Sequence, residues 1–186
     1  MRLDVDERRA QLIALGRELF AKHAYEELSV GEIARRAGIS KGLLYHYFPS
    51  KRDFYVAVIR ATAGELLARV TPDEPTDDPM PAISAYLDYV EAHFGAYAMV
   101  LRSGIGNDAE VMAIVDETRG AMVDRILDGA RVDAPSAVLK LAIRGWVGFA
   151  EATCLDWVQD REVDRTRLAR LLARTLLETF SAAEAL

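Results

Sequence analysis

The chain has 186 residues, a net charge of −6 and an apolar content of 51%. This length suits one ordinary domain, or a small domain joined to a larger one, and excludes a large multidomain enzyme. The only cysteine, Cys154, excludes an internal disulfide and a cysteine-rich zinc site. The charge is uneven, because residues 1–60 hold 11 Lys and Arg against 8 Asp and Glu, which leaves the acidic excess to the rest of the chain.

Apolar residues recur at spacings of three and four with no sustained alternation, which predicts an all-α protein of about nine helices. We expect helices at about 6–23, 29–37, 41–47, 51–70, 81–94, 96–104, 108–131, 135–159 and 164–183. The charged amino terminus lacks the apolar stretch of a secretory signal, and four charged residues interrupt the most apolar helix. We therefore expect a cytoplasmic protein without a membrane span.

Hydroxyl residues and glycines mark where the early helices begin and end. Ser29 can cap the second helix, and Glu32, three residues on, can reach back to complete a capping box. Gly38 supplies the backbone freedom that a tight turn needs, and Ser40 can cap the third helix. Ser50 can cap the fourth helix in the same way. Later in the chain, Gly95 is expected to break a helix, and Pro135 suits a first helical turn.

The segment 71–81 holds four of the six prolines and cannot be helical inside. It separates the chain into residues 1–50, a connecting helix at 51–70 and a helical body at 71–186. The first part has the pattern of a helix-turn-helix, in which two short helices bury Ile33, Leu44 and Phe48. The third helix then exposes lysine, glycine, histidine and tyrosine side chains, which suit a DNA major groove.

The residue types at many fixed positions over roughly residues 9–56 resemble those of the tetracycline-repressor-like family of bacterial transcription regulators, TetR/AcrR. The matching residues are Leu19-Phe20, Tyr25, Ser29-Val30, Ile33-Ala34, Ala37 to Gly42, Leu44-Tyr45, Tyr47-Phe48 and Ser50-Lys51. The resemblance implies a helix-turn-helix DNA-binding domain in residues 1–50 and a ligand-binding and dimerisation domain in residues 71–186. It also implies a homodimer joined by the last two helices as a four-helix bundle.

Roles on DNA follow from residue type. Phosphate contacts are expected from the hydroxyls, from the lysine at the start of the fourth helix and from helix-start amides, namely Ser29, Ser40, Tyr45, Tyr47 and Lys51. Contacts with base edges are expected from Arg36, Lys41, Gly42, Leu43 and His46. Gly42 would let the backbone approach closely, and Leu43 offers only apolar contact, for instance to a thymine methyl group.

The body yields two further sets of candidates. Residues that could line an effector pocket are Tyr86, Tyr89, His93, Tyr97, Arg102, Met112, Trp146 and Phe149. The apolar members could equally be core, and Arg102 could form a salt bridge with an acidic neighbour. Residues that could form the dimer interface are Ile143, Val147, Cys154, Val158, Leu168, Leu172 and Leu176.

The helix-turn-helix pattern predicts DNA binding. The resemblance implies a repressor that binds a near-palindromic operator as a homodimer and responds to a small lipophilic or acidic effector. The alternative is a dimeric DNA-binding or protein-interaction module without an inducer. His93 and Cys154 lack a third residue at a spacing that would indicate catalysis. We therefore expect no enzymatic activity, no metal and no cofactor.

Overall fold

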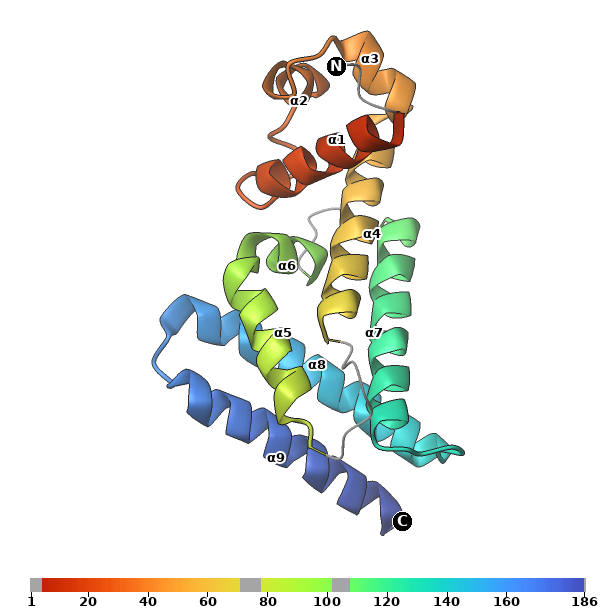
Figure 1. Ribbon diagram of the computed structural model, residues 1–186, viewed down its shortest axis with the longest axis vertical. Coiled ribbons are helices and arrows are strands. Elements are labelled where there is room, and N and C mark those ends of the chain that lie inside the picture. The colour runs from red at the N-terminus through yellow and green to blue at the C-terminus, as the bar shows by residue number, and fades with distance from the viewer. Residues whose placement is uncertain (1–4, 71–77, 102–107, 186) are drawn as a thin grey trace. The chain divides into compact units, whose positions relative to one another are not determined.

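The computed structural model describes residues 5–70, 78–101 and 108–185, and within these ranges every regular element is an α-helix (Figure 1). The helices are α1 (Val5–Phe20), α2 (Val30–Arg36), α3 (Lys41–Tyr47), α4 (Lys51–Val70), α5 (Met80–Ala92), α6 (Phe94–Leu101), α7 (Ala109–Gly129), α8 (Ala137–Asp160) and α9 (Arg165–Glu184). The prediction of an all-α protein with about nine helices is confirmed.

The helices form two compact units. The first unit combines the chain up to Gly64 with Gly95–Val115, and the second combines Glu65–Phe94 with the chain from Asp116 onward. The long helices α4 and α7 each begin in the first unit and end in the second. No helix within the described residues is long and apolar enough to cross a membrane.

The predicted serine caps are present. The Oγ atoms of Ser29 and Ser40 accept hydrogen bonds at 3.1 Å from the backbone amides three residues on, and Ser50 Oγ does the same at 3.0 Å. Each bond satisfies an amide that has no partner inside its helix. Gly38 has a φ of +66° between α2 and α3, where an L side chain would be strained. The amide of Ile39 donates to Ala34 O at 3.0 Å and closes the turn.

Three expected boundaries differ from the structure. α1 ends at Phe20 rather than at residue 23, because the chain continues as a tight turn in which the Lys22 amide bonds Leu19 O. α8 begins after Ser136, whose Oγ accepts from the Leu139 amide at 3.1 Å, so Pro135 precedes the helix. A serine caps a helix with its side chain, which proline cannot do.

The break between α5 and α6 falls at His93 rather than at Gly95, which is the second residue of α6. The glycine is needed there for close packing. A Cβ atom at Gly95 would lie 2.6 Å from the Cβ of Ala21 and 2.8 Å from its carbonyl oxygen. The start of α6 therefore packs directly against the chain that follows α1.

The core of the first unit is rich in aromatic side chains. The Phe20 ring meets the Tyr55 ring edge-on at 4.8 Å, and the Phe48 and Phe54 rings meet at 4.9 Å. Helices α1 and α4 cross at Gly16, where a Cβ atom would lie 2.4 Å from a Val58 methyl carbon. The predicted core residues Ile33, Leu44 and Phe48 are all buried in this cluster, together with Ala34. Their burial leaves the opposite side of α3 to solvent.

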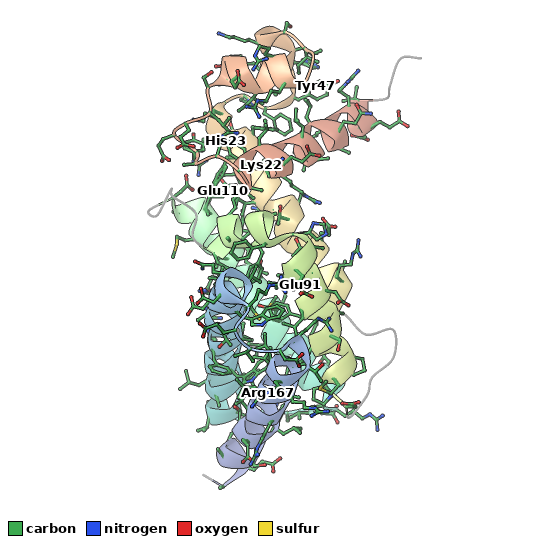
Figure 2. The ribbon with its side chains drawn as sticks, turned by 90° about the vertical axis from the view of Figure 1, so that its left-hand side faces the viewer. Lys22, His23, Tyr47, Glu91, Glu110 and Arg167 are labelled. Carbon is green, nitrogen blue, oxygen red and sulfur yellow. The ribbon has the colours of Figure 1, made fainter. Side chains whose placement is uncertain are left out.

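In the second unit α8 and α9 pack side by side, and α5 contacts both (Figure 1). Arg161 and Arg165 form ion pairs with Glu91 of α5, which is labelled in Figure 2. Arg119 of α7 donates to the nearly buried carboxylate of Glu151 at 2.7 Å. A buried carboxylate requires such a partner, so these bonds link α7 to α8.

Candidate DNA interface and effector pocket

Helix α3 is anchored by one residue and exposes most of the others. Leu44 is buried, whereas Lys41, Gly42, Leu43, Tyr45 and His46 are exposed. Tyr47 is half-buried with its ring edge-on to that of His46 at 5.5 Å. These residues of α3 are expected to contact DNA, and the helix exposes five of them on the surface of the first unit.

The serine caps remain compatible with phosphate binding. Ser29 and Ser40 are exposed, and each hydroxyl oxygen accepts an amide hydrogen bond. A hydroxyl that accepts one bond can still donate its own hydrogen to a phosphate oxygen. Both serines can therefore cap a helix and contact DNA at the same time.

Glu32 does not complete a capping box. Its carboxylate accepts from Arg35 Nη2 at 2.6 Å and from Arg36 Nε at 2.7 Å. Charge-assisted hydrogen bonds are stronger than a bond to a neutral amide, so the Glu32 carboxylate binds the two arginines in preference to the backbone amide of Ser29. These bonds lower the pKa of Glu32 from 4.5 to about 2. Arg36, a predicted base-contact residue, is thus bound to Glu32 through its Nε.

Lys51 lies over an aromatic ring. Its Nζ atom is 3.9 Å from the centroid of the Tyr25 ring, a favourable cation–π contact. Partial burial lowers the pKa of Lys51, opposed by the nearby Glu26 carboxylate. A cation at the start of α4 is disfavoured by the helix dipole, and the ring offsets part of that cost. Tyr25 thereby positions the Lys51 ammonium group, a role that its place in the sequence does not reveal.

Arg52, the next residue, is a structural residue that the sequence reasoning did not single out. Its Nε and Nη2 donate to the two oxygens of Asp108 at 2.6 and 2.8 Å. The Arg52 guanidinium lowers the pKa of Asp108. Asp108 also accepts from the Glu110 and Val111 amides, so it caps α7. The first turn of α4 is therefore joined to the first turn of α7 inside the first unit.

The second unit contains a cavity of about 380 Å³, within the range of small-molecule sites. Its walls come from α5, α7, α8 and α9 and from the end of α4, and they are largely apolar. Lining side chains include Ile83, Met122, Ile126, Val147, Leu172, Leu176 and Phe180. Charged residues enter the lining at Asp78, Arg125 and Glu184. Such a cavity is large enough for a small, mainly apolar molecule.

Of the eight residues expected to line a pocket, Tyr86 and Trp146 do so. Tyr89 is buried against His93 with rings 4.9 Å apart, and Phe149 is exposed on the outside of α8. Tyr97 and Met112 belong to the first unit and do not line this cavity. Arg102 lies outside the described residues. Apolar periodicity identifies an inward face but does not distinguish a filled interior from a hollow one.

The pocket also contains residues that the sequence reasoning missed, notably Arg125, Leu177 and Phe180. Helical spacing along α7 and α9 could have identified these residues, because each lies one helical turn from an apolar residue that also lines the pocket. Within the described residues, no group of three or more His, Cys, Asp or Glu side chains is placed to hold a metal ion.

The structure places most of the candidate dimer residues in the interior of one chain. Ile143, Val147, Cys154, Leu168, Leu172 and Leu176 are buried within the second unit, and Val158 is half-buried. Their contact with a second chain stays a prediction. Burial raises the pKa of the Cys154 thiol to about 12. The apolar side chains that α8 and α9 expose are instead Val138, Leu141, Phe149, Leu171 and Leu177.

Comparison with known proteins links the two units to one family. Residues 12–58 match the family described as bacterial regulatory proteins, tetR family, and residues 75–179 match a tetracyclin repressor-like, C-terminal domain. The chain is 31% identical over 172 residues to the HTH-type transcriptional activator FasR of Mycolicibacterium smegmatis. That alignment covers 88% of this chain and 78% of FasR.

Solved structures agree with these matches. A tetR-family transcriptional regulator from Streptomyces coelicolor has a TM-score of 0.86 and 32% identity, covering 98% of this chain and 84% of that one. FadR from Bacillus subtilis, solved in complex with stearoyl-CoA, shares the fold with a TM-score of 0.69 and 18% identity, over 90% of this chain and 96% of that one. With its helix-turn-helix and its carboxy-terminal domain both matched, the chain belongs to the TetR family of bacterial transcription regulators.

Proposed function

We propose that this regulator binds a near-palindromic operator as a homodimer and releases or engages it in response to a lipophilic effector. The observation that carries the DNA-binding part is the exposure of Lys41, Gly42, Leu43, Tyr45 and His46 around a single buried anchor on α3. A helix held from one side can enter the major groove without unfolding any of the core.

In this proposal residues 1–50 are the DNA-binding domain, residues 51–70 connect it to the body, and residues 71–186 bind the effector and the second subunit. Tyr45, Tyr47 and Lys51 contact phosphates and set the register. Arg36, Lys41, Gly42, Leu43 and His46 contact base edges. A good bidentate base contact contributes about 1–3 kcal/mol, so one copy of this small surface needs a second copy to reach useful affinity.

The outer side of α8 supports dimerisation. Leu141 is 73% exposed, and Phe149 is 40% exposed on the same helix. Gly145 and Gly148 lie between them, and a Cβ atom at either glycine would meet nothing within 4 Å. A glycine inside a helix costs about 1 kcal/mol relative to alanine. Within the described part of one chain these glycines have no packing role. The close approach of a helix from a second subunit would give them one.

The cavity supports an effector. An apolar space of about 380 Å³ with Arg125 in its lining suits an acyl chain whose anionic end meets the arginine. The fold relative FadR was solved with stearoyl-CoA, an acyl thioester of this description. We therefore place long-chain fatty acids and their thioesters first among candidate effectors.

Repression is the direction that the family resemblance implies, although FasR is named an activator. Both outcomes are open to one dimer, because a protein bound over a promoter blocks transcription and one bound beside it can assist. Repression remains our proposal, and a reporter gene placed behind the selected operator measures it.

The DNA interface is tested by selecting operators from random DNA and then measuring variants. Lys51→Ala should weaken binding to operator and random DNA alike and reduce the slope of log affinity against log salt by about one per subunit. Tyr45→Ala should likewise weaken both. Lys22→Ala removes the same charge from the turn after α1 (Figure 2) and serves as the control. If Lys51→Ala and Tyr45→Ala both bind as the wild type does, the interface is assigned to the wrong surface.

A further inference from the structure

The start of α2 carries a glycine whose bare backbone is covered by a side chain from α3. A Cβ atom at Gly31 would lie 2.7 Å from Cε of Lys41 and 3.1 Å from its Nζ. Contacts this short do not occur between real Cβ atoms and carbon, so any side chain at residue 31 would displace the end of Lys41. The lysine therefore occupies the space that the missing side chain leaves.

Backbone conformation does not explain this glycine. Among the described residues Gly38 is the only glycine with a positive φ, so Gly31 has a conformation that alanine can adopt. The next nearest atom to a Cβ at this position is Ser29 Oγ at 3.7 Å, an ordinary contact. Alanine would favour the helix by about 0.5–1 kcal/mol. The close contacts that a Cβ atom would make here are therefore with the end of the Lys41 side chain, which would have to move.

Lys41 has no other anchor. It is exposed at the first position of α3, and no ion pair or hydrogen bond holds its ammonium group in the described part of the chain. A lysine side chain has four rotatable bonds, so its ammonium group is poorly placed unless something limits its path. The backbone surface of Gly31 provides that limit, because it contacts the end of the Lys41 side chain.

We propose that Gly31 is a positioning residue for DNA recognition, which directs the Lys41 ammonium group toward a base-edge acceptor such as guanine O6 or N7. This inference rests on the proposed function of α3. Lysine is a point donor, and its contribution to base discrimination depends on where its ammonium group lies. Displacing it should therefore reduce discrimination between operator and random DNA more than it reduces affinity for random DNA.

The test compares Gly31→Ala, Lys41→Met, the double variant and the matched control Gly64→Ala. Gly64 is an exposed helical glycine of α4 at which a Cβ atom would meet nothing within 4 Å. The measurements are the melting temperature and the ratio of operator affinity to random-DNA affinity at one salt concentration. We expect Gly31→Ala to melt no lower than the wild type and its affinity ratio to fall by about fivefold or more. Gly64→Ala should keep the wild-type ratio.

The double variant identifies the route of the effect. If Gly31 acts through Lys41, the substitution Gly31→Ala changes nothing further once Lys41 is methionine. An unchanged ratio for Gly31→Ala, an equal loss in the Lys41→Met background, or a lower melting temperature from Gly31→Ala would each overturn the inference. A wild-type protein that prefers no DNA sequence would instead overturn the proposed function, and this inference with it.

Discussion

The carboxylate of Glu32 binds two arginine side chains of α2, the helix that precedes α3. It accepts hydrogen bonds from Arg35 and Arg36, which leaves the terminal NH₂ groups of Arg36 available to other partners. The sequence correctly predicts that Ser29 caps α2, because capping depends on residues three positions apart in one helix. The sequence does not predict the hydrogen-bond partners of the Glu32 carboxylate, since several nearby donors compete for it and the geometry decides among them.

This arrangement predicts a pH-dependent stability. The pKa of Glu32 is lowered from 4.5 to about 2, so its bonds stabilise the folded protein fully above pH 4.5. The contribution declines as the pH falls toward 2 and the carboxylate takes up a proton. Glu32→Gln lacks the charge at every pH. Its urea midpoint should therefore lie below that of the wild type at pH 7, and the two should converge between pH 4.5 and 2.

The control for this comparison is Glu178→Gln, which removes a carboxylate 3.8 Å from Arg174 on the surface of α9. That variant should differ little from the wild type, because an isolated exposed ion pair contributes about 0–1 kcal/mol. A difference between Glu32→Gln and the wild type that stays constant across the pH range would contradict the assignment.

At the scale of single elements, the sequence predicts each helix, but for α8 it does not predict which side faces inward. The apolar residues of α8 cover nearly its whole circumference, so periodicity alone cannot separate the two sides. Ile143 and Val147 face the interior, while Leu141 and Phe149 remain exposed. The same ambiguity explains why the sequence suggests both Trp146 and Phe149 as pocket residues, although Trp146 lines the cavity and Phe149 does not.

The pocket between α5, α7, α8 and α9 contains an intrinsic fluorescent reporter. Trp146 lines the cavity, and the second tryptophan, Trp157, does not. In Trp157→Phe, stearoyl-CoA or stearate should change the emission of Trp146 in a saturable way and raise the melting temperature. At 100 times the dissociation constant the gain in stability is about 2.7 kcal/mol.

Two comparisons make this result specific. Coenzyme A without an acyl chain should have no effect, because the cavity is apolar. Ala150→Phe places a large side chain in the lining and should abolish the response without removing the reporter. A response that survives Ala150→Phe would move the binding site elsewhere, and the absence of any response would favour a regulator without this class of effector.

At the scale of the whole molecule, the proposed function depends on two copies acting together. A near-palindromic operator requires a two-fold dimer, and the same surface must then be self-complementary. The family resemblance implies the helices that join the subunits. The particular residues could not be predicted from the sequence, since inward-facing and outward-facing leucines are chemically identical.

Leu141→Glu tests the interface. A carboxylate at this exposed position should leave the fold intact but introduce like charges facing each other across the two-fold axis. Light scattering should give a mass near the 20.6 kDa of one chain, against about twice that for the wild type. Val163→Glu alters another exposed apolar residue, between α8 and α9, and should remain dimeric. If both variants match the wild type in mass, the outer side of α8 is not the interface.

The burial of Cys154 has a consequence for how this regulator can be influenced. Its sulfur lies in the interior of the second unit, and at neutral pH the thiol stays protonated because its pKa is about 12. The nucleophilic thiolate is therefore scarce, and oxidants and alkylating reagents reach it only when the helices around it separate. Oxidants therefore find no accessible thiol among the described residues of the folded chain. The rate at which a thiol reagent modifies this single sulfur instead measures how often the surrounding bundle opens.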